Sequence, residues 1–207
     1  MLHTISENIA VFFFNKDDKY PLDIYVYGIE LMISSLIGTI LVLTLGILFG
    51  HVIESIIFML SLSLIRVFSG GYHAETYLKC NSIFVLSAIF VFLFHRYYLN
   101  YLMQYNILIT AITLLISVAI MIIFAPVENK NKTIEDEKKR KFKVISILFV
   151  FIEIAMSLVL YYQFGFSQGL IILPTVAVVD ISILAEIILK VRRKKNESSK
   201  EHNEKDS

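Results

Sequence analysis

Long, nearly uncharged apolar segments constrain this chain more than any other feature of its sequence. A helix needs about 20 predominantly apolar residues to cross the hydrocarbon core of a bilayer. Four segments meet this requirement, at residues 28–49, 107–125, 142–164 and 169–190. The sequence is 57% hydrophobic and 18% charged, whereas soluble domains carry about 25% charged residues. These segments exclude a water-soluble globular fold and predict an all-α polytopic membrane protein.

Two further segments complete a prediction of six membrane-spanning helices. Residues 51–68 are apolar apart from one acidic and one basic residue, and the short segment 82–94 extends through aromatic residues to Tyr101. With six spans and the N-terminus inside, all 19 basic residues except Arg96 fall on the inner side. Because Lys and Arg are enriched in cytoplasmic loops, we expect a multi-pass protein of the cell membrane with both termini in the cytoplasm.

The two ends of the chain are more polar than the spans. We expect residues 1–193 to form a single membrane-embedded helical domain and residues 194–207 to form a flexible cytoplasmic tail, because the tail is too polar to bury a core. Near the N-terminus, apolar side chains at positions i, i+4, i+7 and i+8 from Ile5 share one helix face. This pattern favours an amphipathic helix at the membrane interface; the alternative is a helix packed on the bundle.

The connection between the second and third spans concentrates reactive residues. It reads Arg66-Val-Phe-Ser-Gly-Gly-Tyr-His-Ala-Glu-Thr-Tyr-Leu-Lys-Cys80 and contains the only cysteine of the chain. A free thiol with a pKa of about 8.5 is only slightly ionised at neutral pH. A neighbouring imidazole that accepts its proton makes it a nucleophile. Cys80 and His73 are therefore the candidate nucleophile and base of a cysteine peptidase.

The spacing of these two residues requires a bend in the backbone. Seven residues along one helix place His73 and Cys80 on the same face but about 10 Å apart, beyond hydrogen-bond reach. Gly70 and Gly71 can adopt conformations closed to other residues, so we expect a cytoplasmic or re-entrant loop. On the residues alone, a buried inert thiol beside an unrelated imidazole stays open, as does a purely topological role for Arg66.

The pattern Arg-x-x-x-Gly-Gly-x-His-Ala, followed by Cys seven residues after the histidine, resembles the motif of the accessory gene regulator B (AgrB) family. These membrane peptidases process quorum-sensing peptide precursors in Gram-positive bacteria. A span that ends in Phe-Ala-Pro126 before a basic connection, the chain length and the six-span layout are similar as well. The resemblance implies that Cys80 is the nucleophile, that His73 is its base, and that Arg66 and Gly71 support the loop.

The resemblance also implies a reaction and a partner. Cys80 would attack the carbonyl group before the C-terminal segment of an AgrD-type propeptide and form an acyl-enzyme thioester. In the family, a Cys or Ser of the precursor captures this thioester and closes a thiolactone or lactone ring, which gives an autoinducing peptide. Glu75 and Asn81 are candidates for orienting the imidazole. Gly70 and Gly71 would also allow close approach of the substrate backbone.

Carboxylates inside the predicted spans support an alternative function. Glu153 and Asp180 lie near the middle of their spans, and an ionisable group in hydrocarbon is a functional hypothesis. The alternative is a small ion-coupled or peptide transporter that uses these two residues. The structural interpretation is a protonated carboxyl group hydrogen-bonded to a neighbour such as Ser157 or Thr175.

Other features indicate further contacts. The basic connection 130–143 favours binding of membrane lipid or of an acidic precursor segment. The pattern Gly46-x-x-x-Gly50 fits a helix contact in a homodimer, although it is common by chance in apolar segments. We expect no nucleic-acid partner, no cofactor and no metal site, because the single cysteine and the scattered histidines lack the spacing of metal-binding motifs.

Overall fold

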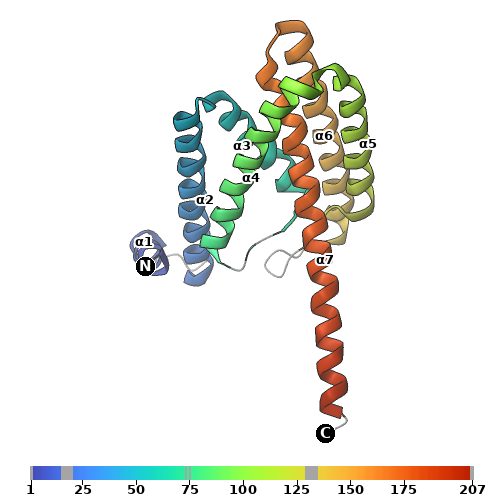
Figure 1. Ribbon diagram of the computed structural model, residues 1–207. Helices are drawn as coiled ribbons and strands as arrows, with labels where there is room; N and C mark the ends of the chain where they lie inside the picture. The colour runs from blue at the N-terminus through green and yellow to red at the C-terminus, as the bar shows by residue number, and fades with distance from the viewer. Residues whose placement is uncertain (1, 15–20, 73, 75, 129–134, 206–207) are drawn as a thin grey trace.

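The computed structural model describes residues 2–14, 21–72, 74, 76–128 and 135–205 as a bundle of helices (Figure 1). These residues contain no strand and form seven α-helices, which confirms the predicted all-α class. The helices are α1 (Leu2–Phe14), α2 (Leu22–Phe49), α3 (Val52–Ser69), α4 (Tyr77–Tyr97), α5 (Asn106–Phe124), α6 (Asp136–Phe164) and α7 (Ile172–Lys205).

Five helical stretches of the described residues are long and apolar enough to cross a membrane. One of them, Tyr77–Phe124, contains both α4 and α5. A π-helical turn at Tyr98–Leu102 and a 3-10 turn at Met103–Tyr105 join the two helices, and Figure 1 shows that they run in opposite directions. The multi-pass membrane fold is therefore confirmed, while the count of six spans stays a prediction.

Glycine and proline residues mark several helix ends. Helix α2 ends at Gly50 with φ 73° and ψ 24°, and α6 ends at Gly165 with φ 64° and ψ 18°. Both glycines adopt the left-handed conformation that closes many helices. Helix α5 ends two residues before Pro126, which cannot donate a backbone hydrogen bond and so cannot continue a helix.

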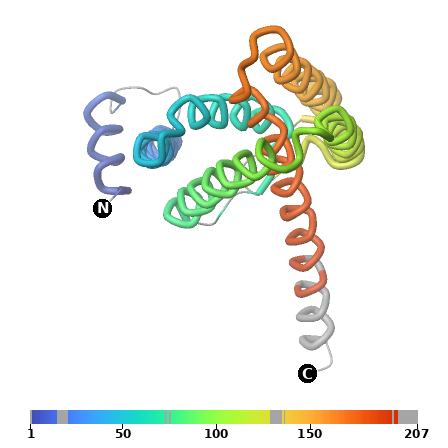
Figure 2. Tube along the Cα trace, turned by 45° about the horizontal axis from the view of Figure 1, so that its top comes forward, coloured from blue at the N-terminus to red at the C-terminus, as the bar shows by residue number. Residues whose placement is uncertain are grey.

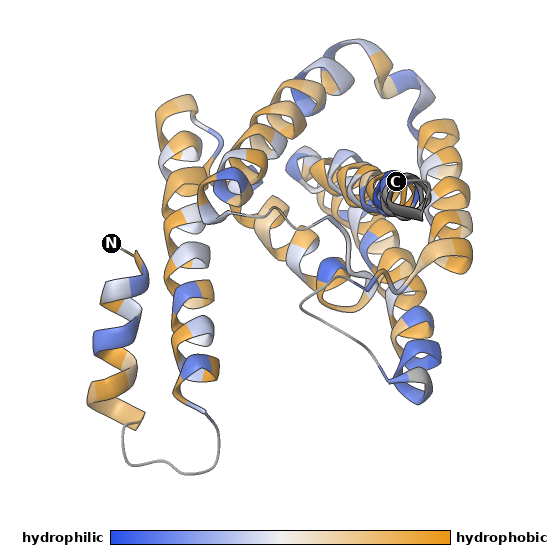
Figure 3. Cartoon of the chain, turned by 90° about the horizontal axis from the view of Figure 1, so that it is seen from below, coloured by the Kyte–Doolittle hydropathy of each residue, from blue (hydrophilic) through white to orange (hydrophobic). Residues whose placement is uncertain are grey.

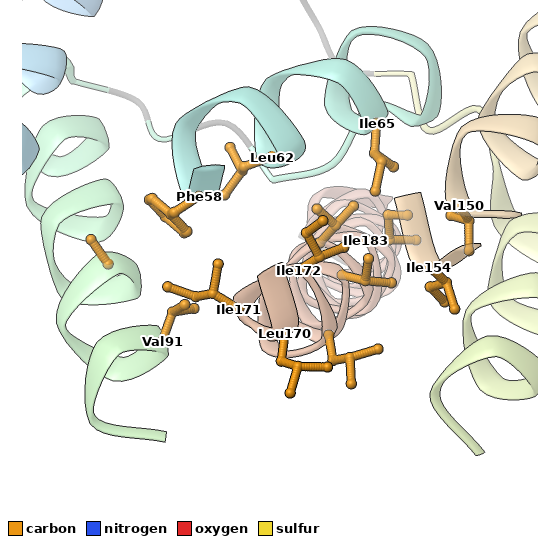
Figure 4. Packing of buried hydrophobic residues seen from close by; sticks show 14 of the residues in the cluster. Phe58, Leu62, Ile65, Val91, Val150, Ile154, Leu170, Ile171, Ile172 and Ile183 are labelled. Carbon is orange, nitrogen blue, oxygen red and sulfur yellow. The ribbon is translucent and has the colours of Figure 1, made fainter. Parts of the chain in front are cut away.

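Helix α7 lies at the centre of the bundle. In the most apolar part of Ser167–Arg193, the candidate span that contains the N-terminal part of α7, 56% of the residues are buried. The corresponding fraction in the other candidate spans is 22–33%. Figure 2 shows α3, α4, α5 and α6 arranged around its N-terminal half. The core consists of aliphatic and aromatic side chains from α3, α4, α6, α7 and the 3-10 turn Ser167–Ile171, several of which Figure 4 shows.

Helix α1 packs beside α2 with a small-residue face. Its buried residues are Ser6 and Ala10, and the ring of Phe14 stacks on Tyr25 with centroids 4.3 Å apart. Phe12 and Phe13 are 81% and 69% exposed. A helix with one packed face and one exposed apolar face suits the membrane interface, so its interfacial position remains our prediction.

The polar connections gather at one end of the bundle. Figure 1 shows the start of α2, the connection from α3 to α4 and the end of α5 at the end from which the C-terminal half of α7 projects. Seen from that end, Figure 3 shows hydrophobic residues along most of the helices. This arrangement agrees with the predicted grouping of the basic connections, and which side is cytoplasmic remains a prediction.

Two sequence interpretations change in detail. Gly46 packs inside the chain, because a Cβ atom there would overlap the hydroxyl of Ser55 on α3. The Gly46-x-x-x-Gly50 pattern thus serves packing within the chain, and the homodimer stays untested. Helix α7 continues to Lys205, so helix extends beyond residue 193, while the division of the chain between 193 and 194 stays a prediction. The segment is rich in Lys and Glu, which favour helix even where no core is available.

Candidate functional site

The loop between α3 and α4 bends at two consecutive glycines. Gly70 has φ 73° and ψ −150°, and Gly71 has φ 138°. These are conformations that residues with a Cβ atom rarely adopt. The bend separates α3 from α4. The sequence predicted a bend here, because one continuous helix would hold His73 and Cys80 too far apart. His73 itself lies outside the described residues.

The first half of the loop is fixed to the segment that follows α5. The N–H of Val127 donates a hydrogen bond of 2.8 Å to the carbonyl of Ser69, and Gly70 forms an isolated parallel bridge with Val127. A Cβ atom at Gly70 would overlap the carbonyl group of Val127. Glycine is therefore required here both for its backbone conformation and for the close approach of two chain segments.

The second half of the loop is fixed to the central helix. The N–H of Tyr72 donates a hydrogen bond of 3.1 Å to the carbonyl of Ser182 on α7. A Cβ atom at Gly71 would overlap the Ser182 hydroxyl. The loop is thus held between α7 and the end of α5, two elements that are far from it in sequence. The sequence did not predict that Ser182 and Val127 contact the loop. A serine in an apolar span is the only weak signal of such a contact.

Arg66 connects the loop to the candidate nucleophile. Its guanidinium Nη2 donates a hydrogen bond to the Tyr72 carbonyl, and Arg66 and Cys80 line the same cavity. A snorkelling arginine would extend to the membrane surface. This side chain reaches the carbonyl of Tyr72 in the loop, and its supporting role stays a prediction.

Cys80 lies in the first turn of α4. The helix begins after Thr76, whose hydroxyl accepts a hydrogen bond of 3.3 Å from the N–H of Lys79. The N–H of Cys80 donates to the Thr76 carbonyl at 3.0 Å. The N-terminal end of a helix dipole favours negative charge, so the first turn of α4 suits a thiolate. Cys80 is a free, half-buried cysteine.

A cavity of about 540 Å³ adjoins Cys80, Arg66 and Tyr72. Its volume lies within the range of roughly 300–1,000 Å³ that is usual for ligand sites. The lining is mostly apolar and comes from α3, the loop, α4 and α7.

The structure separates the other candidate residues. Asn81 points away from the cavity, toward α2, where its Oδ1 accepts a hydrogen bond of 3.5 Å from Ser34. It is absent from the residues that line the cavity, and its role in orienting the imidazole stays a prediction. Glu75 lies outside the described residues, so its role is equally untested.

The two intramembrane carboxylates have serine partners on other helices. Ser61 of α3 donates to Glu153, and Ser117 of α5 donates to Asp180 at 2.5 Å. These partners differ from Ser157 and Thr175, which the sequence suggested. The second oxygen of each carboxyl group is buried, without a hydrogen-bond partner among the described residues. A hydrogen-bonded carboxyl group agrees with the structural interpretation of these residues.

The comparisons with known proteins identify relatives of this chain. The family model for accessory gene regulator B matches residues 5–186. AgrB-like protein 2 of Clostridium perfringens (strain 13 / Type A) is 33% identical over 156 residues. An AgrB-like protein of Clostridium perfringens (strain SM101 / Type A) is 30% identical over 156 residues. Each alignment covers 72% of this chain and 73% of the relative. No solved structure matches the chain.

Proposed function

The chain belongs to the accessory gene regulator B family, and from this premise we propose that it is a membrane cysteine endopeptidase that cleaves a quorum-sensing propeptide. Membership of the family gives it a role in accessory gene regulator quorum-sensing processing. The single observation that carries the finer proposal is the place of Cys80: it lies in the wall of a mostly apolar cavity of about 540 Å³ that Arg66 also lines.

The proposed reaction begins with proton transfer from the Cys80 thiol to the imidazole of His73. The sulfur then forms a bond with the carbonyl carbon before the C-terminal segment of an AgrD-type propeptide. The C–N bond breaks, and the leaving amine takes the proton from the imidazole. The products of this step are the free C-terminal segment and an acyl-enzyme thioester on Cys80.

The second step converts the thioester into a ring. A Cys or Ser side chain of the bound precursor attacks the thioester carbonyl, and the Cys80 thiol is regenerated. Water would compete by hydrolysing the thioester, so a water-excluding site favours cyclisation. The apolar lining of the cavity supports this part of the proposal. The product is a lactone or thiolactone autoinducing peptide.

The arrangement of the chain supports a cytoplasmic site. The connection between α3 and α4, the end of α5 and the C-terminal half of α7 lie at the same end of the bundle (Figure 1), and most basic residues of the sequence fall in or next to these segments and the connection after α5. By the charge bias of membrane proteins this end faces the cytoplasm of a Gram-positive cell. The basic connection after α5 then faces anionic lipid and the precursor.

Two substitutions test the proposal. Cys80→Ala and His73→Ala should each abolish cleavage of a co-expressed, C-terminally tagged AgrD-type propeptide, while membrane insertion is unchanged. Leu78→Ala is the matched control, because Leu78 lies in the same helical turn but is 79% exposed. Cleavage that survives Cys80→Ala would refute the proposed nucleophile.

A second measurement needs no precursor. The alkylation rate of the single cysteine is followed against pH by intact mass in the parent protein and in His73→Ala. If the two residues are coupled, the parent keeps a substantial rate at lower pH and the variant does not. Coincident pH profiles would remove the support for His73 as the base.

A further inference from the structure

The cavity beside Cys80 is elongated along the contact between α4 and α7. On α4 its wall runs from Cys80 past Ile83 and Ser87 to Phe90. The rise along the helix from Cys80 to Phe90, which are ten positions apart, is about 15 Å. Arg66, Tyr72 and Cys80 form the polar end near the loop, and the remaining wall is dominated by apolar side chains.

The long side of the cavity is bordered by exposed apolar residues. Leu86 and Phe90 of α4 are 62% and 50% exposed, and Ile181 of α7 is 58% exposed. In a membrane-spanning bundle such side chains face lipid. A peptide segment that lies in the interface can therefore enter from the bilayer, with its reactive carbonyl at the polar end.

We propose that this cavity binds the apolar side chains of the acyl part of the substrate, namely the residues directly before the bond that Cys80 cleaves. This inference rests on the proposed function, since it takes Cys80 as the nucleophile. The sulfur becomes bonded to the acyl part, so the space nearest the sulfur receives that part. A departing segment that is charged would lose its hydration in an apolar cavity and therefore stays outside.

The dimensions agree with this assignment. An extended chain rises about 3.3 Å per residue, so a cavity of about 15 Å accommodates roughly four residues of the acyl part. These residues remain in the cavity after the C-terminal segment has left. They hold the thioester away from water until the precursor's own Cys or Ser attacks it. The cavity thus selects for apolar residues before the cleavage site and retains the intermediate.

Peptide aldehydes test the proposal, because they end at the reactive carbonyl and so occupy only the acyl side. The Cys80 sulfur adds to the aldehyde carbon, the oxygen takes the proton, and a hemithioacetal forms without a leaving group. Acetyl-leucyl-leucinal and acetyl-glycyl-glycinal are compared for protection of Cys80 against N-methylmaleimide. The full-length protein is used in lipid nanodiscs, and alkylation is read by intact mass.

We expect the leucine aldehyde to protect Cys80 at concentrations at least about tenfold lower than the glycine aldehyde, because each buried methylene contributes about a fourfold preference. The control is a cysteine at an exposed position of the same turn, Leu78→Cys combined with Cys80→Ala. It corrects for partitioning of the aldehydes into the bilayer. The proposal is overturned if the protecting concentrations of the two aldehydes differ by the same factor at positions 78 and 80. A lipid chain that fills the cavity would give this result.

A pair of substitutions locates the preference. Ser87 lines the cavity, whereas Ser82 is exposed on α4 and does not line it. Ser87→Phe should remove the preference for leucine, and Ser82→Phe should keep it; the opposite pattern would refute the assignment. None of these measurements requires propeptide cleavage. Failure of the cavity's preference and failure of Cys80 as nucleophile therefore appear in separate experiments.

Discussion

Replacing Gly70 with alanine should detach the loop from the end of α5. Gly70 adopts φ 73° and ψ −150°, a region that is essentially restricted to glycine and costs other residues about 1–3 kcal/mol. The new Cβ atom would also overlap the Val127 carbonyl, and a backbone atom cannot move aside as a flexible side chain can. Losing the hydrogen bond between Val127 and Ser69 costs about 0.5–1.5 kcal/mol more.

These contributions together favour the detached loop by about 1.5–4.5 kcal/mol, which is roughly a 10- to 2,000-fold change in the ratio of attached to detached molecules. Hydrogen exchange of the amides of Val127 and Tyr72 measures this ratio directly, because both donate to the anchoring carbonyls. We expect their exchange in Gly70→Ala to accelerate by at least roughly tenfold, and precursor cleavage to fall with it.

Gly165→Ala is the matched control. Gly165 also has a positive φ, of 64°, but no atom lies within 4 Å of its added Cβ position. The Gly165→Ala variant should lose about 1 kcal/mol of stability through backbone strain alone. Precursor cleavage and hydrogen exchange of the amides of Val127 and Tyr72 should stay unchanged. Our explanation would be refuted if Gly70→Ala retained protected amides at Val127 and Tyr72, or if both glycine variants behaved alike.

Three further predictions concern residues around the site. Arg66→Lys keeps the charge but loses the guanidinium geometry that reaches the Tyr72 carbonyl. Cleavage should fall by roughly 10- to 150-fold, since hydrogen bonds of charged groups contribute about 1.5–3 kcal/mol. Unchanged cleavage would contradict the supporting role proposed for Arg66. Glu153→Gln and Asp180→Asn keep an oxygen that accepts from serine, so cleavage should stay within about threefold; an abolished ion-coupled peptide uptake in vesicles would instead favour the transporter alternative. Glu30→Gln weakens the contacts of α2 with His3 and Tyr77. Amide hydrogens of α1 should then exchange about fivefold faster, as expected for a loss of about 1 kcal/mol. Equal exchange in the parent and the variant would show that α1 is held by packing alone.

Much of the site follows from local sequence. The apolar segments require spanning helices because a bilayer cannot hydrogen-bond an open backbone. A continuous helix would keep His73 and Cys80 about 10 Å apart, so this segment requires a bend, and the glycine pair just before His73 permits one. Both deductions involve residues that are close in sequence, where the geometry of the backbone is sufficient.

Other features depended on the tertiary structure. Helices in a bilayer are apolar on the faces toward lipid and on the faces toward the core, so periodicity does not reveal which face meets which neighbour. The sequence therefore could not place Cys80 on the cavity side of α4 and Asn81 on the side of α2. It also could not bring Ser182 to Tyr72, 110 residues away in the chain.

The sequence by itself determined that this chain is a helical membrane protein whose single cysteine follows a glycine-containing connection between two spans. The packing of α7 and of the segment after α5 against that loop decided where the cysteine points and what surrounds it. The physical reason is that the composition of a segment sets its preferred solvent and local backbone, whereas a cavity exists only between segments. Its shape is set by residues that no local pattern connects.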